Sequence, residues 1–228
     1  AEAYALYRGM YAEAARLWVA DGRRDHLITV FASDTPAFDA CVSLGYGAVG
    51  IDTLRDMAPS PTASKRGVPA PDIRRATPSD VDLIAPLEIA LRDHLAASPT
   101  FLPRDIEEPT HFDEAFLADT SRGLWLAFRD DEPRAFLCLV GGWGQVLPTS
   151  DPHVVSCIGA YTAPESRGSG VAAALLDRGI EWARDAGYTR CAVDFETANV
   201  PGAAFWLSKG FQPVTRSLYR HTHDTGLN

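Results

Sequence analysis

Residues 160–172 combine the residue types and the spacing of a phosphate-binding turn. An apolar run that predicts a strand leads into Arg167, Gly168 and Gly170, and an amphipathic run that predicts a helix follows at once. Glycine lets the backbone approach a bulky anion, and the first amides of a helix have no partner within the helix. Because these amides lie at the positive end of the helix dipole, the segment predicts a phosphate or pyrophosphate site.

Two classes of ligand compete for this turn. The run from Gly168 to Ala173 also matches the dinucleotide pattern GxGxxA, and Asp194 follows at about the distance of a ribose-binding acid. A dinucleotide fingerprint turns directly from strand to glycine, however, whereas residues 163–167 intervene here. That fold also needs more strands downstream than the remaining chain offers. We therefore expect a different phosphate-bearing ligand.

The elements that would position the turn alternate between strands and helices. Strands are predicted at 73–77, 124–129, 135–140, 154–162, 190–195 and 214–221. Helices are predicted from residue 78 to about 95 and at 112–118, 171–186 and 201–209. Residues 58–71 are rich in Pro, Ser, Gly and Ala, which predicts a linker.

The spacing Arg167-x-x-Gly170-x-Ala172 resembles the pyrophosphate loop of the GNAT (GCN5-related) acetyltransferases, [QR]xxGx[GA]. Asn199 opens the next predicted helix and Lys209-Gly210-Phe211 closes it, which is similar to the usual ending of that family. The resemblance covers about two thirds of the chain. It implies an α/β GNAT acyl-CoA N-acyltransferase fold, in which helices flank a mixed central sheet.

The function that this resemblance implies is transfer of an acetyl group from acetyl-CoA to an amine, either of a small molecule or of a protein. A non-catalytic acetyl-CoA-binding sensor or scaffold is the alternative. The resemblance also implies the residues that bind the cofactor. They are Arg167, Gly168, Ser169, Gly170, Val171 and Ala172 for the pyrophosphate, Ile158, Ala160, Tyr161 and Thr162 for the pantetheine arm, and Asn199 and Trp206 beside it.

The catalytic groups depart from the family pattern. Trp206 stands where the family often has a tyrosine that protonates the departing thiolate, and an indole cannot act as an acid. The predicted strand 154–162 contains no carboxylate. Asp194 and Glu196 are the substitutes, because residues two apart on a strand share one face. We expect Glu196 to relay the amine proton; the sequence leaves open whether the base is Glu196, Asp194 or water.

Composition narrows the class of protein further. The net charge is −9, of which residues 1–70 contribute −1, so the second part could attract a cationic amine and lacks a basic nucleic-acid footprint. No apolar run approaches the ~20 residues of a membrane span, and no signal peptide is recognised. The four scattered cysteines predict neither a metal site nor disulfides, which favours a cytoplasmic protein. A homodimer is left open.

The first part of the chain contains an internal repeat. Gly22 and Gly45 are separated by the same interval as Gly187 and Gly210, and Pro36 falls between the first two where Pro201 falls between the second two. We therefore predict that residues 1–57 form a partial, degenerate GNAT-like half-domain with the order helix, strand, helix, strand. It would be followed by the linker 58–71 and by the GNAT domain 72–228. No phosphate loop occurs within residues 1–57, so no cofactor site is expected there.

Overall fold

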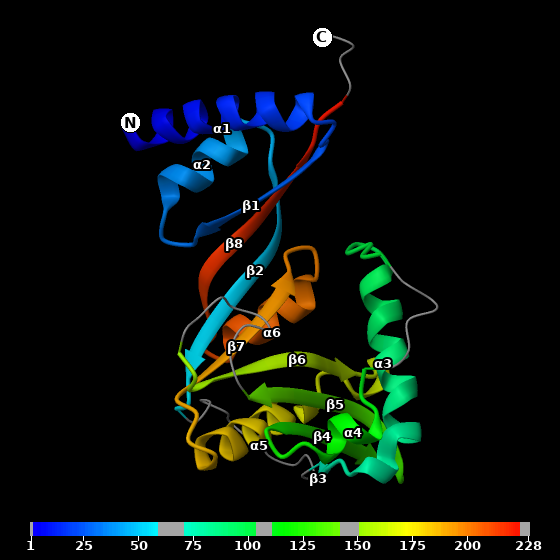
Figure 1. Cartoon of the computed structure of the whole chain (residues 1–228). Coiled ribbons are helices and arrows are strands. Elements are labelled where there is room, and N and C mark those ends of the chain that lie inside the picture. Colours follow the sequence, from blue (N-terminus) through cyan, green and yellow to red (C-terminus); the bar gives the residue numbers. More distant parts are fainter. Residues whose placement is uncertain (1, 59–70, 104–110, 142–150, 224–228) are drawn as a thin grey trace.

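An eight-stranded mixed sheet runs through the whole molecule (Figure 1). The computed structural model describes residues 2–58, 71–103, 111–141 and 151–223. The strand order is β1-β8-β2-β7-β6-β5-β4-β3, and β6 and β7 are parallel while the other neighbours are antiparallel. The strands are β1 (Asp25–Phe31), β2 (Gly47–Asp56), β3 (Asp72–Arg75), β4 (Arg122–Arg129), β5 (Glu132–Gly141), β6 (Val154–Thr162), β7 (Arg190–Glu196) and β8 (Gln212–His221).

Helices flank the sheet along its length. They are α1 (Glu2–Ala20), α2 (Thr35–Ser43), α3 (Val81–Ala96), α4 (Glu114–Ala118), α5 (Val171–Asp185) and α6 (Val200–Ser208), with short 3₁₀ turns at Pro78–Asp80 and Pro164–Ser166. The strands and helices predicted from residue 73 onward are all present, with ends that differ by a few residues. Among the described residues, no helix is long and apolar enough to span a membrane.

The core has two layers because alternate residues of β5 are buried on opposite faces. Leu137 and Leu139 pack against α5, whose apolar stripe includes the fully buried Leu175 and Leu176. Phe136 and Cys138 pack on the other face, in the cluster that includes residues of α3. Burial of each leucine is worth about 1.5–3 kcal/mol, so the α5 stripe fixes the helix, and the glycine turn before it, against the sheet.

The N-terminal segment is built into this sheet. Residues 2–57 fold as α1, β1, α2 and β2, which is the predicted order of elements. β2 lies between β7 and β8, and β8 lies between β2 and β1. Both hydrogen-bonding edges of β2 are therefore paired, and β8 contacts strands of the first segment on both sides. Most of the predicted linker 58–71 lies outside the described residues.

The first and last parts of the chain match element by element. A single constant offset along the sequence places both ends of β1, α2 and β2 on the ends of β7, α6 and β8. The pairing of β1 with β8 has the same register as that of β7 with β2, since Asp25 pairs with His221 and Arg190 with Asp56. Asp34 and Asn199 cap α2 and α6 in the same way, each accepting a hydrogen bond from the amide three residues later.

Candidate acetyl-CoA site

The strands β6 and β7 separate partway along their length. They pair in parallel only from Val154 opposite Arg190 to Cys157 opposite Val193. From Gly159 to Thr162, β6 keeps its pairing with β5 on the other side, and the register shift before Gly159 leaves Ile158 as an extra residue. Figure 1 shows the two strands diverging. The β7-facing edge of residues 158–162 is therefore open to an extended ligand that could add to it like a strand.

The glycine turn follows β6 after a short 3₁₀ turn at Pro164–Ser166. Gly168 and Gly170 have φ angles of +71° and +93°, which residues with a side chain rarely adopt. Gly170 is the N-cap residue of α5, and no side chain caps this helix end within the described residues. An added Cβ at either glycine would meet no atom within 4 Å, so the space outside the turn is open. An accessible helix N-terminus of this kind could bind an anion.

Side chains around the turn fix its shape. Arg167 Nε donates to the carbonyl oxygen of Thr162 at 3.0 Å, and Ser169 Oγ donates to that of Ser166 at 2.6 Å. The buried Ser166 Oγ has no hydrogen-bond partner among the described residues. Burial and the charge of Arg167 lower the pKa of His94, in the last turn of α3. The two side-chain hydrogen bonds hold the loop to the end of β6 and to the 3₁₀ turn.

Two residues expected beside the pantetheine arm lie on α6. Asn199 Oδ1 accepts a hydrogen bond from the Gly202 amide at 3.2 Å, which leaves its Nδ2 group as a donor. Trp206 is 7% exposed and lies in the core cluster on the α5 face. Its ring centroid is 4.9 Å from that of Phe205 and 5.4 Å from that of Phe211. Trp206 is therefore held by packing.

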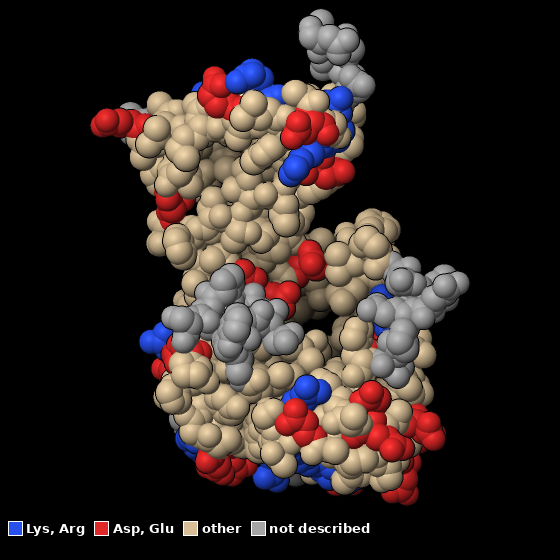
Figure 2. Space-filling view, viewed as in Figure 1, with Lys and Arg blue, Asp and Glu red and all other residues tan. Residues whose placement is uncertain are grey.

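The two candidate base residues lie on the other face of β7. Asp194 and Glu196 alternate with Val193 and Phe195, which are buried in the α5-side cluster. In the register of the sheet, Asp194 stands opposite Asp52 of β2. Figure 2 shows acidic side chains beside a hollow at the waist of the molecule, over β2 and β7. The structure therefore brings Asp194 and Glu196 together beside the point where β6 and β7 part.

The environment of these carboxylates raises the pKa of both. Loss of hydration, followed by the negative charge of Asp52, raises the pKa of Asp194. Loss of hydration, followed by the charge of Asp194, raises the pKa of Glu196. A carboxylate with a raised pKa is a better proton acceptor than an ordinary one. Sequence reasoning missed Asp52, because it stands in the first segment and belongs to no motif.

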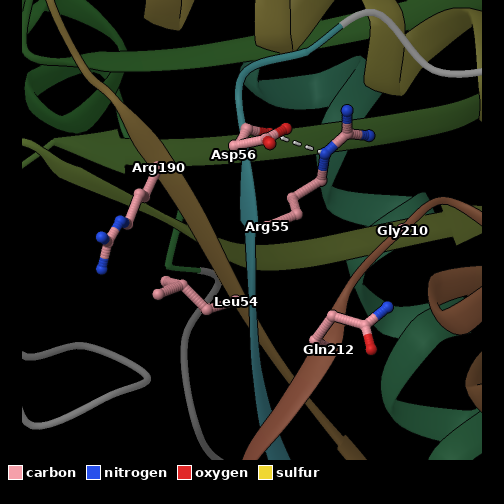
Figure 3. A pocket seen from close by; sticks show the side chains of 6 residues that line it. All are labelled: Leu54, Arg55, Asp56, Arg190, Gly210 and Gln212. Atoms are coloured by element: carbon pink, nitrogen blue, oxygen red, sulfur yellow. Dashed lines mark hydrogen bonds between the residues drawn. The ribbon is translucent and has the colours of Figure 1, made fainter.

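A second hollow, of about 200 Å³, lies at the opposite end of β7 (Figure 3). Its lining residues are Leu54, Arg55, Asp56, Arg190, Gly210 and Gln212. Arg55 Nε donates to the carbonyl oxygen of Asp56 at 2.9 Å, and the Arg190 side chain points away from Arg55. Because β6 begins at this end and reaches the glycine turn at its other end, this hollow is separate from the candidate cofactor site.

Comparison with known proteins agrees with this architecture. The sequence model of the Acetyltransferase (GNAT) family matches residues 89–211. The chain is 31% identical over 151 residues to aminoglycoside N(6')-acetyltransferase type 1 of Stenotrophomonas maltophilia, covering 66% of this chain and 92% of that protein. It is 27% identical over 103 residues to N-acetyltransferase 8B of Rattus norvegicus, covering 43% of each.

A solved structure, a GNAT-family acetyltransferase from Colwellia psychrerythraea, has the same fold. It superposes with a TM-score of 0.55 at 12% identity, covering 88% of this chain and 65% of that one. The mixed sheet that opens beside a glycine turn agrees with this fold. The chain belongs to the GNAT acetyltransferase family. It is an acetyl-CoA-dependent N-acetyltransferase whose acceptor is an amine, which confirms the predicted α/β GNAT fold with a mixed sheet, the activity and the cofactor.

Proposed function

We propose that this enzyme acetylates a small cationic amine at the opening between β6 and β7, with Glu196 as the proton acceptor. The observation that carries this proposal is the placement of Asp194 and Glu196 on one face of β7, beside the opening. Negative groups at that place attract an ammonium ion. The relative from Stenotrophomonas maltophilia is named for an aminoglycoside acceptor, which is a small molecule with several amines.

The cofactor would be held mainly by backbone groups. The pyrophosphate would accept hydrogen bonds from the amides of residues 167–172, which include the first turn of α5. The pantetheine arm would pair with the open edge of β6 at Ile158, Ala160, Tyr161 and Thr162. Asn199 Nδ2 would donate to the arm, and Trp206 would support the wall behind it. Backbone amides of β6 would polarise the thioester carbonyl without the help of a side chain.

Proton transfer is the step that needs a side chain. An alkylammonium group has a reference pKa of about 10.4, so the amine must lose a proton before its nitrogen attacks the thioester carbon. Glu196, directly or through water, would accept that proton. The C–S bond then breaks, and the thiolate leaves without an acid because a thiol has a reference pKa of only about 8.5. This is consistent with a tryptophan at position 206.

We also propose that residues 1–57 are a degenerate half-copy of the GNAT fold, joined by the linker 58–71 to the catalytic domain 72–228. The equal spacing of elements and the equal register of the two strand pairings support this. In this arrangement β2 completes the sheet of the catalytic domain, and β8 completes the sheet of the half-copy. A homodimer and the cytoplasmic location remain predictions, which light scattering and cell fractionation would test.

The experiment that tests the function is acetyl-CoA turnover with a panel of amines. The panel contains aminoglycosides, simple diamines and a peptide with free amino groups, and both free thiol and acetylated product are measured. We expect the aminoglycosides or diamines to be acetylated. Acetylation of the peptide alone would favour a protein amino group as the acceptor. Binding of acetyl-CoA without transfer to any amine would support the non-catalytic alternative and contradict the proposal.

A further inference from the structure

The N-terminal segment contributes a carboxylate to the catalytic face of the sheet. β2 is hydrogen-bonded to β7 through the register that sets Asp52 opposite Asp194 and Gly50 opposite Glu196. On the other side of β2, the hydroxyl of Thr215 in β8 donates a hydrogen bond to Asp52 Oδ2. Asp52 is thus held in place by one neighbouring strand and faces Asp194 on the other.

We propose that Asp52 is a positioning residue of the acyl-transfer site, which acts through Asp194 on the carboxylate that accepts the amine proton. This inference rests on the proposed role of Glu196. It makes the N-terminal segment a functional part of the enzyme. The three carboxylates form a row in which Asp52 acts on Asp194 and Asp194 acts on Glu196.

The pair β1 and β8, which corresponds to the pair β7 and β2, has no carboxylates at the equivalent positions. When β2 is aligned with β8 and β7 with β1, Asp52 corresponds to Ser217 and Asp194 to Thr29. Those two side chains form a neutral hydrogen bond of 3.1 Å between their hydroxyl groups. Opposed carboxylates destabilise a strand pair, whereas a hydroxyl pair stabilises it. The destabilising carboxylate pair therefore involves β7, next to the open edge of β6, where the charge of Asp194 can act on Glu196.

Asp194 interacts with titratable groups on three strands. They are Asp52 of β2, Glu196 of β7 and the buried Cys157 thiol of β6. β8 presents the neutral Thr215 to Asp52, and His94 of α3 interacts with Arg167. Removing the charge of Asp52 should therefore lower the pKa of Asp194. Because Asp194 then carries its negative charge at lower pH, the pKa of Glu196 should rise slightly.

The test compares Asp52→Asn with Thr29→Val in the full chain. Asparagine keeps the shape of aspartate and can still accept the hydrogen bond of Thr215, so the strand pairing should survive. Carboxyl NMR titration of ¹³C-labelled protein reports Asp194 and Glu196 directly, without a substrate. We expect Asp52→Asn to shift the Asp194 titration to lower pH by at least about half a unit. Thr29→Val should leave it unchanged.

The kinetic arm measures kcat against pH with the best amine of the panel. Because Glu196 then has an ionised Asp194 beside it, Asp52→Asn should move the acidic limb to higher pH, by less than the Asp194 titration moves, while the KM for acetyl-CoA stays the same. An acidic limb that stays in place, or a loss of rate that is equal at every pH, would overturn the role of Asp52 while leaving the proposed function intact. If the unaltered chain transfers no acetyl group to any amine, the proposed function fails and this inference fails with it.

Discussion

Replacement of Gly170 by aspartate tests the glycine turn as the seat of the pyrophosphate. Gly170 is the N-cap residue of α5 and has a φ of +93°, so a side chain there strains the backbone by about 1 kcal/mol. The added carboxylate would also lie beside the first-turn amides. It would accept their hydrogen bonds and repel the anionic ligand. We expect acetyl-CoA binding to weaken at least tenfold, which corresponds to about 1.4 kcal/mol.

The matched control is Gly187→Asp. Gly187 follows the other end of α5, has a φ of +89° and also faces open space. The control therefore introduces a similar strain and the same charge away from the turn. Isothermal titration calorimetry with acetyl-CoA measures both variants, and circular dichroism confirms that they are folded. Equal affinities for the Gly170→Asp variant and the unaltered chain would refute the assignment of the turn.

Four further predictions follow from the same structure. Glu196→Gln should lower kcat at least tenfold and leave acetyl-CoA affinity intact, since general-base help is worth about a hundredfold or more. Trp206→Phe should have a smaller effect on kcat. Full kcat for Glu196→Gln from pH 6 to 9 would place the base elsewhere. Asp80→Asn should destabilise the fold by about 1–3 kcal/mol in urea titrations, because Asp80 is 5% exposed and accepts two hydrogen bonds from Arg74, at 2.9 and 2.7 Å. That pairing lowers the pKa of Asp80. The contribution of Asp80 to the free energy of unfolding is therefore complete above the unfolded pKa of about 3.9 and is lost as the pH falls. A destabilisation by Asp80→Asn that is as large at pH 2 as at pH 7 would contradict this. Asp194 affects stability in the opposite direction, because its pKa is raised and its ionisation at higher pH destabilises the fold. Asp52→Asn removes the charge opposite Asp194. It should therefore stabilise the protein by about 0.2–1 kcal/mol at pH 8, and not at pH 3, in thermal unfolding. Residues 72–228 alone should aggregate, because β8 would lose both neighbouring strands; cooperative unfolding of that fragment would contradict the interleaved sheet.

Local pattern was enough to predict the catalytic half of the fold. The period of the apolar residues on α5, the alternation on β7 and the glycines at both ends of α5 are all properties of neighbouring residues. β6 runs from Val154 to Thr162, as its apolar run predicts. These signals are strong because burial on one stripe or one face fixes the secondary structure.

Local sequence patterns could not predict which distant strands pair with β2. Nothing in residues 47–56 indicates that they lie between β7 and β8, because strand neighbours far apart in sequence are chosen by the packing of the whole sheet. The role that we propose for Asp52 depends on this insertion and could not be seen without it. The place of Trp206 in the sequence motif predicts a contact with the cofactor. In the structure, however, Trp206 is surrounded by core residues.

A crystal structure of the chain with bound acetyl-CoA would show the cofactor site directly. We expect the pyrophosphate to accept hydrogen bonds from the amides of residues 167–172 and the pantetheine arm to pair with the β6 edge at residues 158–162. The thioester carbon should lie beside Glu196. A cofactor bound elsewhere, such as in the hollow lined by Arg55 and Arg190, would rule out the glycine turn as the pyrophosphate site.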